Sequence, residues 1–142
     1  MKILVATDGS QPSKRAVKFA IKLVGKVTSE SNQVTLVNVQ EDASLRRSEL
    51  FVGRPAVVSY LRQLSERDMK AAARLLDTAG IAHDTVFRTG HVAQEILACA
   101  KAGKFDLIVI GSKGRSSIAD LLVGSAAQRV LTTAKLPVIL VK

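Results

Sequence analysis

The sequence contains no tryptophan, a single tyrosine and a single cysteine, and aromatic residues make up only 4% of its 142 residues. A lone cysteine cannot form an intramolecular disulfide, which excludes a disulfide-stapled scaffold. Cys99 lies among apolar helix positions, where a small buried thiol is common, so we expect a core residue and not a redox centre. The scarcity of aromatic residues also leaves few stacking partners for the bases of nucleic acids.

Long hydrophobic runs are absent as well. The longest apolar runs, such as 107–110 and 137–141, have the length of a strand. They fall far short of the roughly 18 to 20 residues that a membrane-spanning helix needs. The apolar stretch that follows Lys2 is too short for the core of a signal peptide. The sequence therefore predicts a cytoplasmic protein with no transmembrane segment.

Acidic residues are outnumbered by basic ones, which gives a formal net charge of +9. Clustered cations attract phosphates, so such a charge raises the question of nucleic-acid or membrane binding. Lys14, Lys18 and Lys22 share one face of a predicted helix, but the other basic residues recur in nearly every segment. This distribution favours a solvated basic surface over a nucleic-acid-binding one.

Length and composition are those of one ordinary globular domain. Hydrophobic residues make up 47% of the chain and charged residues 23%, far from the composition of a disordered protein. A chain of 142 residues can bury a sizeable core but has little room for a second folded unit. We therefore expect a single domain over residues 1–142.

Predicted strands alternate with predicted helices along the chain. Hydrophobic spacing predicts a first helix from Ser10, as N-cap, to about Gly25. It predicts further helices over 55–79, which ends at Gly80 as a left-handed C′ residue, over 91–102 and over 125–134. We expect strands over 2–7, 34–39, 81–88, 105–110 and 136–141. Residues 41–54 are polar and weakly periodic, which predicts a long mobile connection. Strict alternation predicts a parallel sheet covered by helices on both faces, with any ligand beyond the carboxyl ends of its strands.

The run Gly111-Ser112-Lys113-Gly114-Arg115 follows the fourth predicted strand, and Gly124-Ser125 begins a helix nine residues after Gly114. Glycines let a backbone approach a phosphate, and a helix N-terminus favours an anion. Hydroxyl and cationic side chains in these segments add donors. Turn glycines and an ordinary N-cap would produce the same residues, so a purely structural role stays open. Neither the Walker A motif nor Gly-x-Gly-x-x-Gly occurs.

The spacing Gly111-x2-Gly114-x9-Gly124-Ser125 resembles the nucleotide-binding motif of the universal stress protein family. The resemblance extends over essentially the whole chain, from the strand that ends in 6–10 to the terminal 136–141. It implies a three-layer α/β sandwich of the adenine nucleotide alpha hydrolase-like kind. Its five-stranded parallel sheet would have the order 3-2-1-4-5. ATP would lie across the carboxyl ends of strands one and four, and the protein would be dimeric. The predicted strand 136–141 is the expected interface, because an edge strand has unpaired backbone groups that a two-fold partner can cover.

Site residues follow from the same resemblance, position by position. Asp8 resembles the acid near the adenosine, and the backbone of Val39 would meet the adenine. Residues 111–114 resemble the ribose and phosphate loop, and 124–127 the phosphate-binding start of a helix. The predicted nucleotide-binding residues are Ala6, Thr7, Asp8, Val39, Ile110, Gly111, Ser112, Lys113, Gly114, Arg115, Gly124, Ser125, Ala126 and Ala127.

Ala127 departs from the pattern, because some ATP-binding members carry a hydroxyl there. The ligand is therefore expected to be ATP, ADP or AMP, with magnesium as an option. Catalytic constellations are thin: His83 and His91 lack further partners for zinc, and no Gly-x-Ser-x-Gly elbow occurs. The sequence thus favours a regulatory binding protein. A slow ATP hydrolase or phosphotransferase that uses Lys113 and Arg115, and an interaction module with an empty site, remain alternatives.

Overall fold

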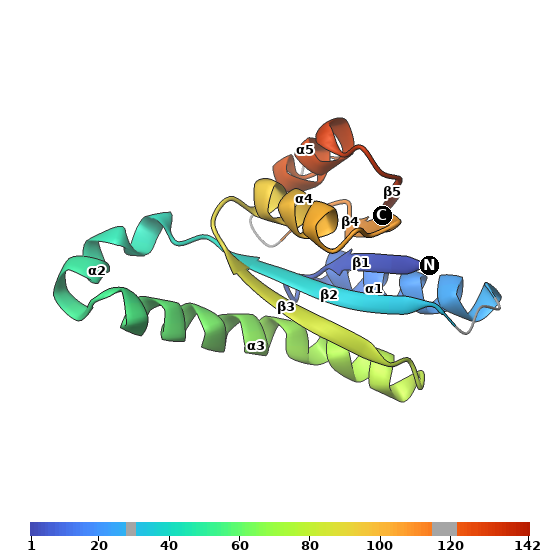
Figure 1. Cartoon of the computed structure of the whole chain (residues 1–142), viewed down its shortest axis with the longest axis horizontal. Coiled ribbons are helices and arrows are strands. Elements are labelled where there is room, and N and C mark those ends of the chain that lie inside the picture. The colour runs from blue at the N-terminus through green and yellow to red at the C-terminus, as the bar shows by residue number, and fades with distance from the viewer. Residues whose placement is uncertain (28–30, 115–121) are drawn as a thin grey trace.

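Strands and helices alternate along the chain, as Figure 1 shows. The computed structural model describes residues 1–27, 31–114 and 122–142. The strands are β1 (Lys2–Ala6), β2 (Gln33–Gln40), β3 (His83–Thr89), β4 (Leu107–Gly111) and β5 (Val138–Val141). The helices are α1 (Gln11–Lys26), the 3₁₀ turn η1 (Ala43–Leu45), α2 (Arg46–Val52), α3 (Arg54–Thr78), α4 (Val92–Ala102) and α5 (Ser125–Thr133).

Within the described residues, five strands form one parallel sheet in the order β3-β2-β1-β4-β5. Val5 in β1 pairs with Leu36 of β2 on one side and with Val109 of β4 on the other. The strand order therefore reverses beside β1, and the carboxyl ends of all strands meet at one edge of the sheet. The expected fold class and strand order are confirmed.

Alternating side chains of the strands fill two hydrophobic layers. Ile3 and Val5 pack among side chains of α1 and α3, whereas Leu4 and Ala6 face those of α4 and α5. Figure 1 shows α4 and α5 on one side of the sheet and α3 on the other. Every residue of β4 is buried, as a continuous apolar strand between two helical layers requires.

Two predicted helix ends are confirmed. The Ser10 hydroxyl accepts a hydrogen bond from the backbone N–H of Ser13, at 3.3 Å, and so caps the start of α1. After α3 the chain passes through Gly80 with φ of +69°, a left-handed conformation that costs glycine little.

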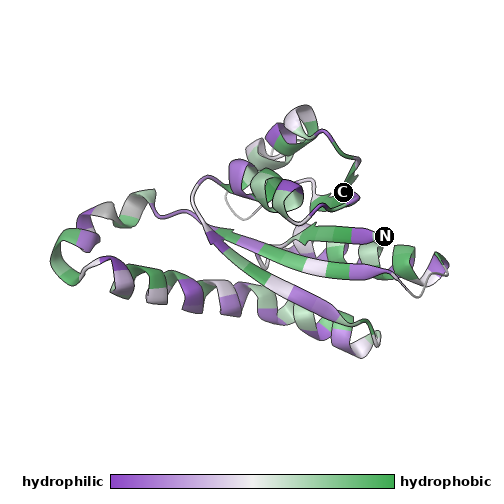
Figure 2. Ribbon diagram, in the orientation of Figure 1, coloured by the Kyte–Doolittle hydropathy of each residue, from purple (hydrophilic) through white to green (hydrophobic). Residues whose placement is uncertain are grey.

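The prediction of an irregular connection over 41–54 is wrong, because residues 43–52 are helical. Arg54 holds this segment together through ion pairs with Asp42, at 3.1 Å, and with Glu49. Leu50 and Phe51 are 86% and 88% exposed, so the apolar residues of α2 face away from the core. Figures 1 and 2 show α2 and the start of α3 extending beyond the sheet. A helix with few contacts to the core has no core-facing apolar stripe, so its hydrophobic pattern does not predict a helix.

Cys99 is a free, buried thiol in α4, which confirms the expected core position. Burial raises the pKa of this thiol above its ordinary value, and a thiol that resists ionisation is a poor nucleophile. Of the helices in the described ranges, none combines the length and the apolar character needed to cross a membrane.

Candidate functional site

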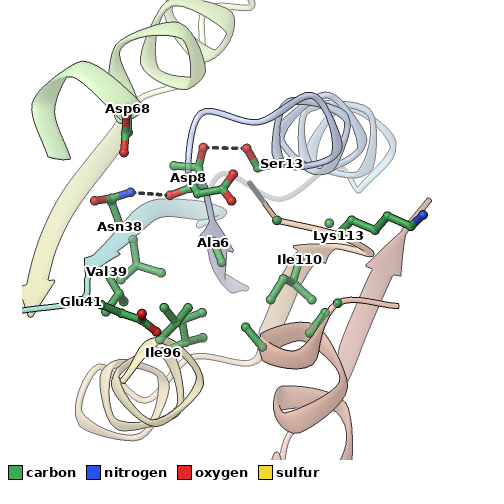
Figure 3. Close-up of a pocket in the computed structure, with 18 of the residues that line it drawn as sticks. Ala6, Asp8, Ser13, Asn38, Val39, Glu41, Asp68, Ile96, Ile110 and Lys113 are labelled. Carbon is green, nitrogen blue, oxygen red and sulfur yellow. Dashed lines mark hydrogen bonds between the residues drawn. The ribbon is translucent and has the colours of Figure 1, made fainter. Parts of the chain in front are cut away.

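A cavity of about 550 Å³ opens at the carboxyl edge of the sheet, between the ends of β1, β2 and β4 and the helices α3, α4 and α5. Its size falls within the range of small-molecule pockets, about 300 to 1,000 Å³. Figure 3 shows Ala6 and Asp8 near its middle, Lys113 on one side and Asp68 with Glu41 on the other. The cavity therefore lies where the strand order reverses, the usual ligand position in a parallel sheet.

Most of the predicted site residues line this cavity. Twelve of the predicted positions do so: Ala6, Thr7, Asp8, Val39, Ile110, Gly111, Lys113, Gly114, Gly124, Ser125, Ala126 and Ala127.

Ser112 does not line the cavity and is only 5% exposed. Its backbone N–H donates to the carbonyl of Val141 at 2.7 Å, and its carbonyl accepts from the N–H of Gly124 at 2.6 Å. Ser112 thus joins β4 to β5 and to the start of α5. Arg115 falls outside the described residues.

One side of the cavity, which we call the glycine end, consists of Gly111, Lys113, Gly114 and residues 124–127. A Cβ at position 111 would lie 2.7 Å from the carbonyl carbon of Pro12. Packing of β4 against the start of α1 therefore requires this glycine, whatever the cavity holds. A Cβ at position 114 would lie 2.9 Å from Oδ2 of Asp8, so the bare backbone of Gly114 borders that carboxylate.

The start of α5 contributes backbone donors to the glycine end. Gly124 is the N-cap, and no described side chain caps the helix. The N–H groups of the first helical turn have no partner within their own helix, and the helix dipole makes this terminus favourable for anions. The Lys113 side chain extends away from Ala6 and Asp8 in Figure 3. Within the described residues, the backbone N–H groups at the start of α5 therefore contribute positive potential to the cavity.

Asp8 stands between the two sides of the cavity, in the turn that follows β1. Its Oδ1 accepts a hydrogen bond from the N–H of Ser10 at 2.9 Å, and Gly9 adopts a φ of +81°. The turn thus fixes the carboxylate close to Gly114. Within residues 1–27, 31–114 and 122–142, no three His, Cys, Asp or Glu side chains gather into a preformed metal site.

The opposite side, which we call the β2 end, consists of residues 38–41 with Asp68 and Ile96. Sequence reasoning found only Val39 of these. Asn38 and Gln40 could have been suspected, because polar side chains at the carboxyl end of a parallel strand lie at the ligand edge. Asp68 had a weaker signal, a carboxylate on a mostly apolar stripe of α3 that includes Leu61 and Leu76.

The parallel sheet, with its order reversed beside β1 and a cavity at that edge, defines an α/β protein of the doubly wound class. The model of the universal stress protein family matches residues 1–142, and the chain belongs to this family.

Individual relatives agree with this assignment. The chain is 32% identical over 147 residues to universal stress protein MJ0531 of Methanocaldococcus jannaschii, covering 99% of this chain and 81% of that protein. The structure of MJ0577 superposes with a TM-score of 0.85 at 25% identity, covering 99% of this chain and 94% of MJ0577.

Two further solved structures share the fold and contain nucleotides. A universal stress protein in complex with cAMP has a TM-score of 0.73 at 23% identity, covering 100% of this chain and 97% of its own. The universal stress protein from Archaeoglobus fulgidus in complex with dAMP has a TM-score of 0.69 at 20% identity, covering 100% and 98%.

Proposed function

We propose that this protein binds an adenine nucleotide in the cavity, with the phosphates at the glycine end and the base at the β2 end. The observation that carries the proposal is that glycine backbone and the start of α5, which no described side chain caps, lie together on one wall of the cavity. Backbone N–H groups at a helix start form a natural anion site. A phosphate chain is the ligand group that would use several of them at once.

The β2 end suits a flat purine. Val39 and Ile96 supply apolar surface, and neighbouring polar groups can fix the orientation of a ring. Structures of the same fold that hold cAMP and dAMP support adenine as the base. Because Ala127 offers no hydroxyl, we expect phosphate binding to rest largely on backbone donors, with ADP and AMP as competitors of ATP.

Magnesium fits this arrangement only together with the nucleotide. The ion usually takes one or two carboxylates and completes its shell with phosphates and water. Asp8, whose Oδ2 borders Gly114, is the carboxylate placed to contribute. When bound, the ion would neutralise part of the phosphate charge.

Calorimetric titration with ATP, ADP and AMP, each with and without magnesium, tests the proposal. Protein that was purified, denatured and analysed for released nucleotide provides an independent measurement. We expect heat of binding or a co-purified adenine nucleotide. Absence of both would overturn the proposal and leave only the fold.

We further propose that the protein acts as a regulatory homodimer joined through β5. This strand is the last in the sheet order and all four of its residues are only half-buried. An edge strand has unpaired backbone groups, and a two-fold partner can cover them. Light scattering at micromolar concentration should give twice the mass of the chain, and a strict monomer would contradict the dimer.

A further inference from the structure

A second hollow, which we call the basic groove, lies between α1 and α3. It has a volume of about 430 Å³, and none of the described residues that line it also lines the cavity at the carboxyl edge. Among these lining residues there is no acidic or aromatic side chain. There are five cations, two from α1 and three from α3, namely Lys14, Lys18, Arg67, Lys70 and Arg74. The groove is therefore a strongly positive site that the proposed nucleotide function does not use.

The fold brings these cations together from distant parts of the chain. α1 and α3 are separated in sequence by β2 and α2, but both pack on the same face of the sheet. Val17 of α1 belongs to the same hydrophobic cluster as Met69 and Ala72 of α3. Leu75 packs against this cluster and also lines the groove. The even spread of basic residues along the sequence thus becomes a local concentration of positive charge.

The cations of the basic groove repel one another. Lys14 and Lys18 stand four residues apart on α1, and Lys70 and Arg74 do so on α3. Like charges at this spacing destabilise a helix. Among the described residues, the five cations make one ion pair, that of Arg67 with its neighbour in sequence at 3.4 Å. A bound anion would relieve the repulsion that remains.

The polar groups of the groove are almost all hydrogen-bond donors. Ammonium and guanidinium groups donate hydrogen bonds and accept none, and among the described lining side chains only the Thr78 hydroxyl can accept. A peptide has backbone N–H groups, which would face donors there. A chain of phosphates presents acceptors alone and carries a negative charge at each phosphate. The lining therefore has the polarity that complements a phosphate chain.

The dimensions of the groove favour a single chain without bases. α3 lines it from Arg67 to Thr78, a length of about 16 Å at a rise of 1.5 Å per residue. Several consecutive phosphates fit along this length. Proteins that bind single-stranded nucleic acids commonly stack aromatic side chains on the bases, and the described lining has none. A volume of about 430 Å³ is also too small for a duplex.

We propose that the basic groove binds a free linear polyphosphate, with its chain along α1 and α3. Arg67 and Arg74 offer planar sets of donors that fit phosphate oxygens, while the lysines supply mobile point charges. The groove is separate from the cavity at the carboxyl edge, so this inference does not depend on nucleotide binding.

Calorimetric titration of the unmodified protein tests the ligand class. The probes are long-chain inorganic polyphosphate, polyglutamate and oligothymidylate, compared at equal concentrations of negative charge. We expect polyphosphate to bind at least about tenfold more tightly than either other polymer, a difference of about 1.4 kcal/mol. No binding of polyphosphate at low salt would overturn the proposal. Equal or tighter binding of polyglutamate or oligothymidylate would overturn it as well, in favour of an acidic protein or a nucleic acid.

A triple variant, Lys18→Gln with Lys70→Gln and Arg74→Gln, tests the location. All three side chains are exposed, so the fold should tolerate the changes. Exposed ion pairs contribute modestly, so we expect polyphosphate affinity to fall about tenfold. The slope of log affinity against log salt concentration should become shallower by about two, since each cation accounts for roughly 0.7 of it.

The matched control removes three exposed cations from the other side of the sheet, by Lys101→Gln with Arg129→Gln and Lys135→Gln. This variant has the same net charge as the groove variant, and its polyphosphate affinity should stay within about threefold of the unmodified protein. An equal loss in both variants would mean that net charge alone attracts the polymer, and would overturn the groove as the site.

Competition with ATP separates the groove from the cavity. Saturating ATP should leave polyphosphate affinity within about threefold of its value without nucleotide, because no described residue lines both hollows. Displacement of polyphosphate by ATP, together with unchanged binding in the groove variant, would place the polymer at the glycine end and overturn this inference while supporting the proposed function.

Discussion

The two ends of the cavity are built in different ways. The glycine end is made largely of backbone from two short segments that a single sequence motif encompasses. The β2 end is made of side chains, with Asn38 and Gln40 from β2 and Asp68 from the middle of α3. Backbone donors can bind phosphates of any nucleotide, whereas oriented side chains can discriminate between bases. The comparison suggests that affinity and selectivity reside at opposite ends, and four substitutions can break or sharpen it.

The largest effect on stability is expected from Gly111→Ala, which would disrupt the packing of the glycine end and destabilise the fold. The added Cβ would lie 2.7 Å from the Pro12 carbonyl carbon. Overpacking that forces the backbone to shift costs about 3 kcal/mol at the upper end of its usual range. Urea unfolding measures the loss. Gly25→Ala is the control, because nothing lies within 4 Å of its added Cβ. A Gly111→Ala protein of unchanged stability would contradict the close contact.

Gly114→Val should separate binding from stability. Its side chain would crowd Asp8 Oδ2, which lies 2.9 Å from the Cβ position, and would keep phosphates from the backbone. Loss of one or two charge-assisted hydrogen bonds weakens nucleotide affinity about a hundredfold. Because Gly114 is exposed, we expect the free energy of unfolding to change by less than about 0.5 kcal/mol.

Lys113→Gln is the comparison for this measurement, since Lys113 lines the same end of the cavity while its side chain extends away from Ala6 and Asp8. We expect its affinity for nucleotide to fall by less than about threefold at physiological salt. Unchanged nucleotide affinity in Gly114→Val, or a larger loss in Lys113→Gln, would show that the Lys113 ammonium and not the backbone N–H groups provides the affinity.

Asn38→Leu should affect the β2 end. The substitution keeps the volume but removes the donor to the Thr7 carbonyl and the acceptor for Gln40. A buried polar group left without its partner costs about 1 to 3 kcal/mol, so we expect the free energy of unfolding to fall by about 2 kcal/mol. Thermal unfolding measures this loss. Thr35→Val, on the same strand but outside the cavity lining, is the control. Equal stability of the two variants would show that these two hydrogen bonds contribute nothing.

Ala127→Ser has the smallest expected effect and sharpens the comparison. Ala127 lines the glycine end and is 3% exposed, so a hydroxyl there would add one side-chain donor to an end that consists largely of backbone. A hydrogen bond of this kind contributes about 0.5 to 1.5 kcal/mol, which corresponds to a two- to tenfold gain in ATP affinity. The ratio of the affinities for ATP and for purine riboside triphosphate, which lacks the amine of adenine, should stay constant. A change in that ratio would mean that the two ends are coupled.

The same contrast explains how far the sequence alone could lead. Strand and helix alternation, the Ser10 cap and the burial of β4 follow from local periodicity and capping chemistry, and they were predictable. The family resemblance supplied the strand order and the glycine end. Packing of Gly111 against Pro12 was not predictable, because it depends on which strand lies beside which helix.

Asp68 and α2 escaped prediction for related reasons. A carboxylate within a helix gives no sign of the amide it will meet across the fold, and Gln40 and Asp68 become partners only when α3 packs on β2. Residues 46–52 form a helix whose apolar side chains point away from the core. Their sequence therefore lacks the core-facing apolar stripe by which a helix is recognised.

The contact between Gly111 and Pro12 also limits how the protein can be retargeted to new ligands. Position 111 admits no side chain, so neither natural drift nor a designed library can tune the cavity there without losing the scaffold. The Gln40 and Asp68 side chains meet through a side-chain hydrogen bond, whereas the main chain of Gln40 pairs with Thr89 of β3, so exchanging these side chains keeps the main-chain pairing of β2. A search for altered ligand preference should therefore hold the glycine wall constant and randomise the opposite one.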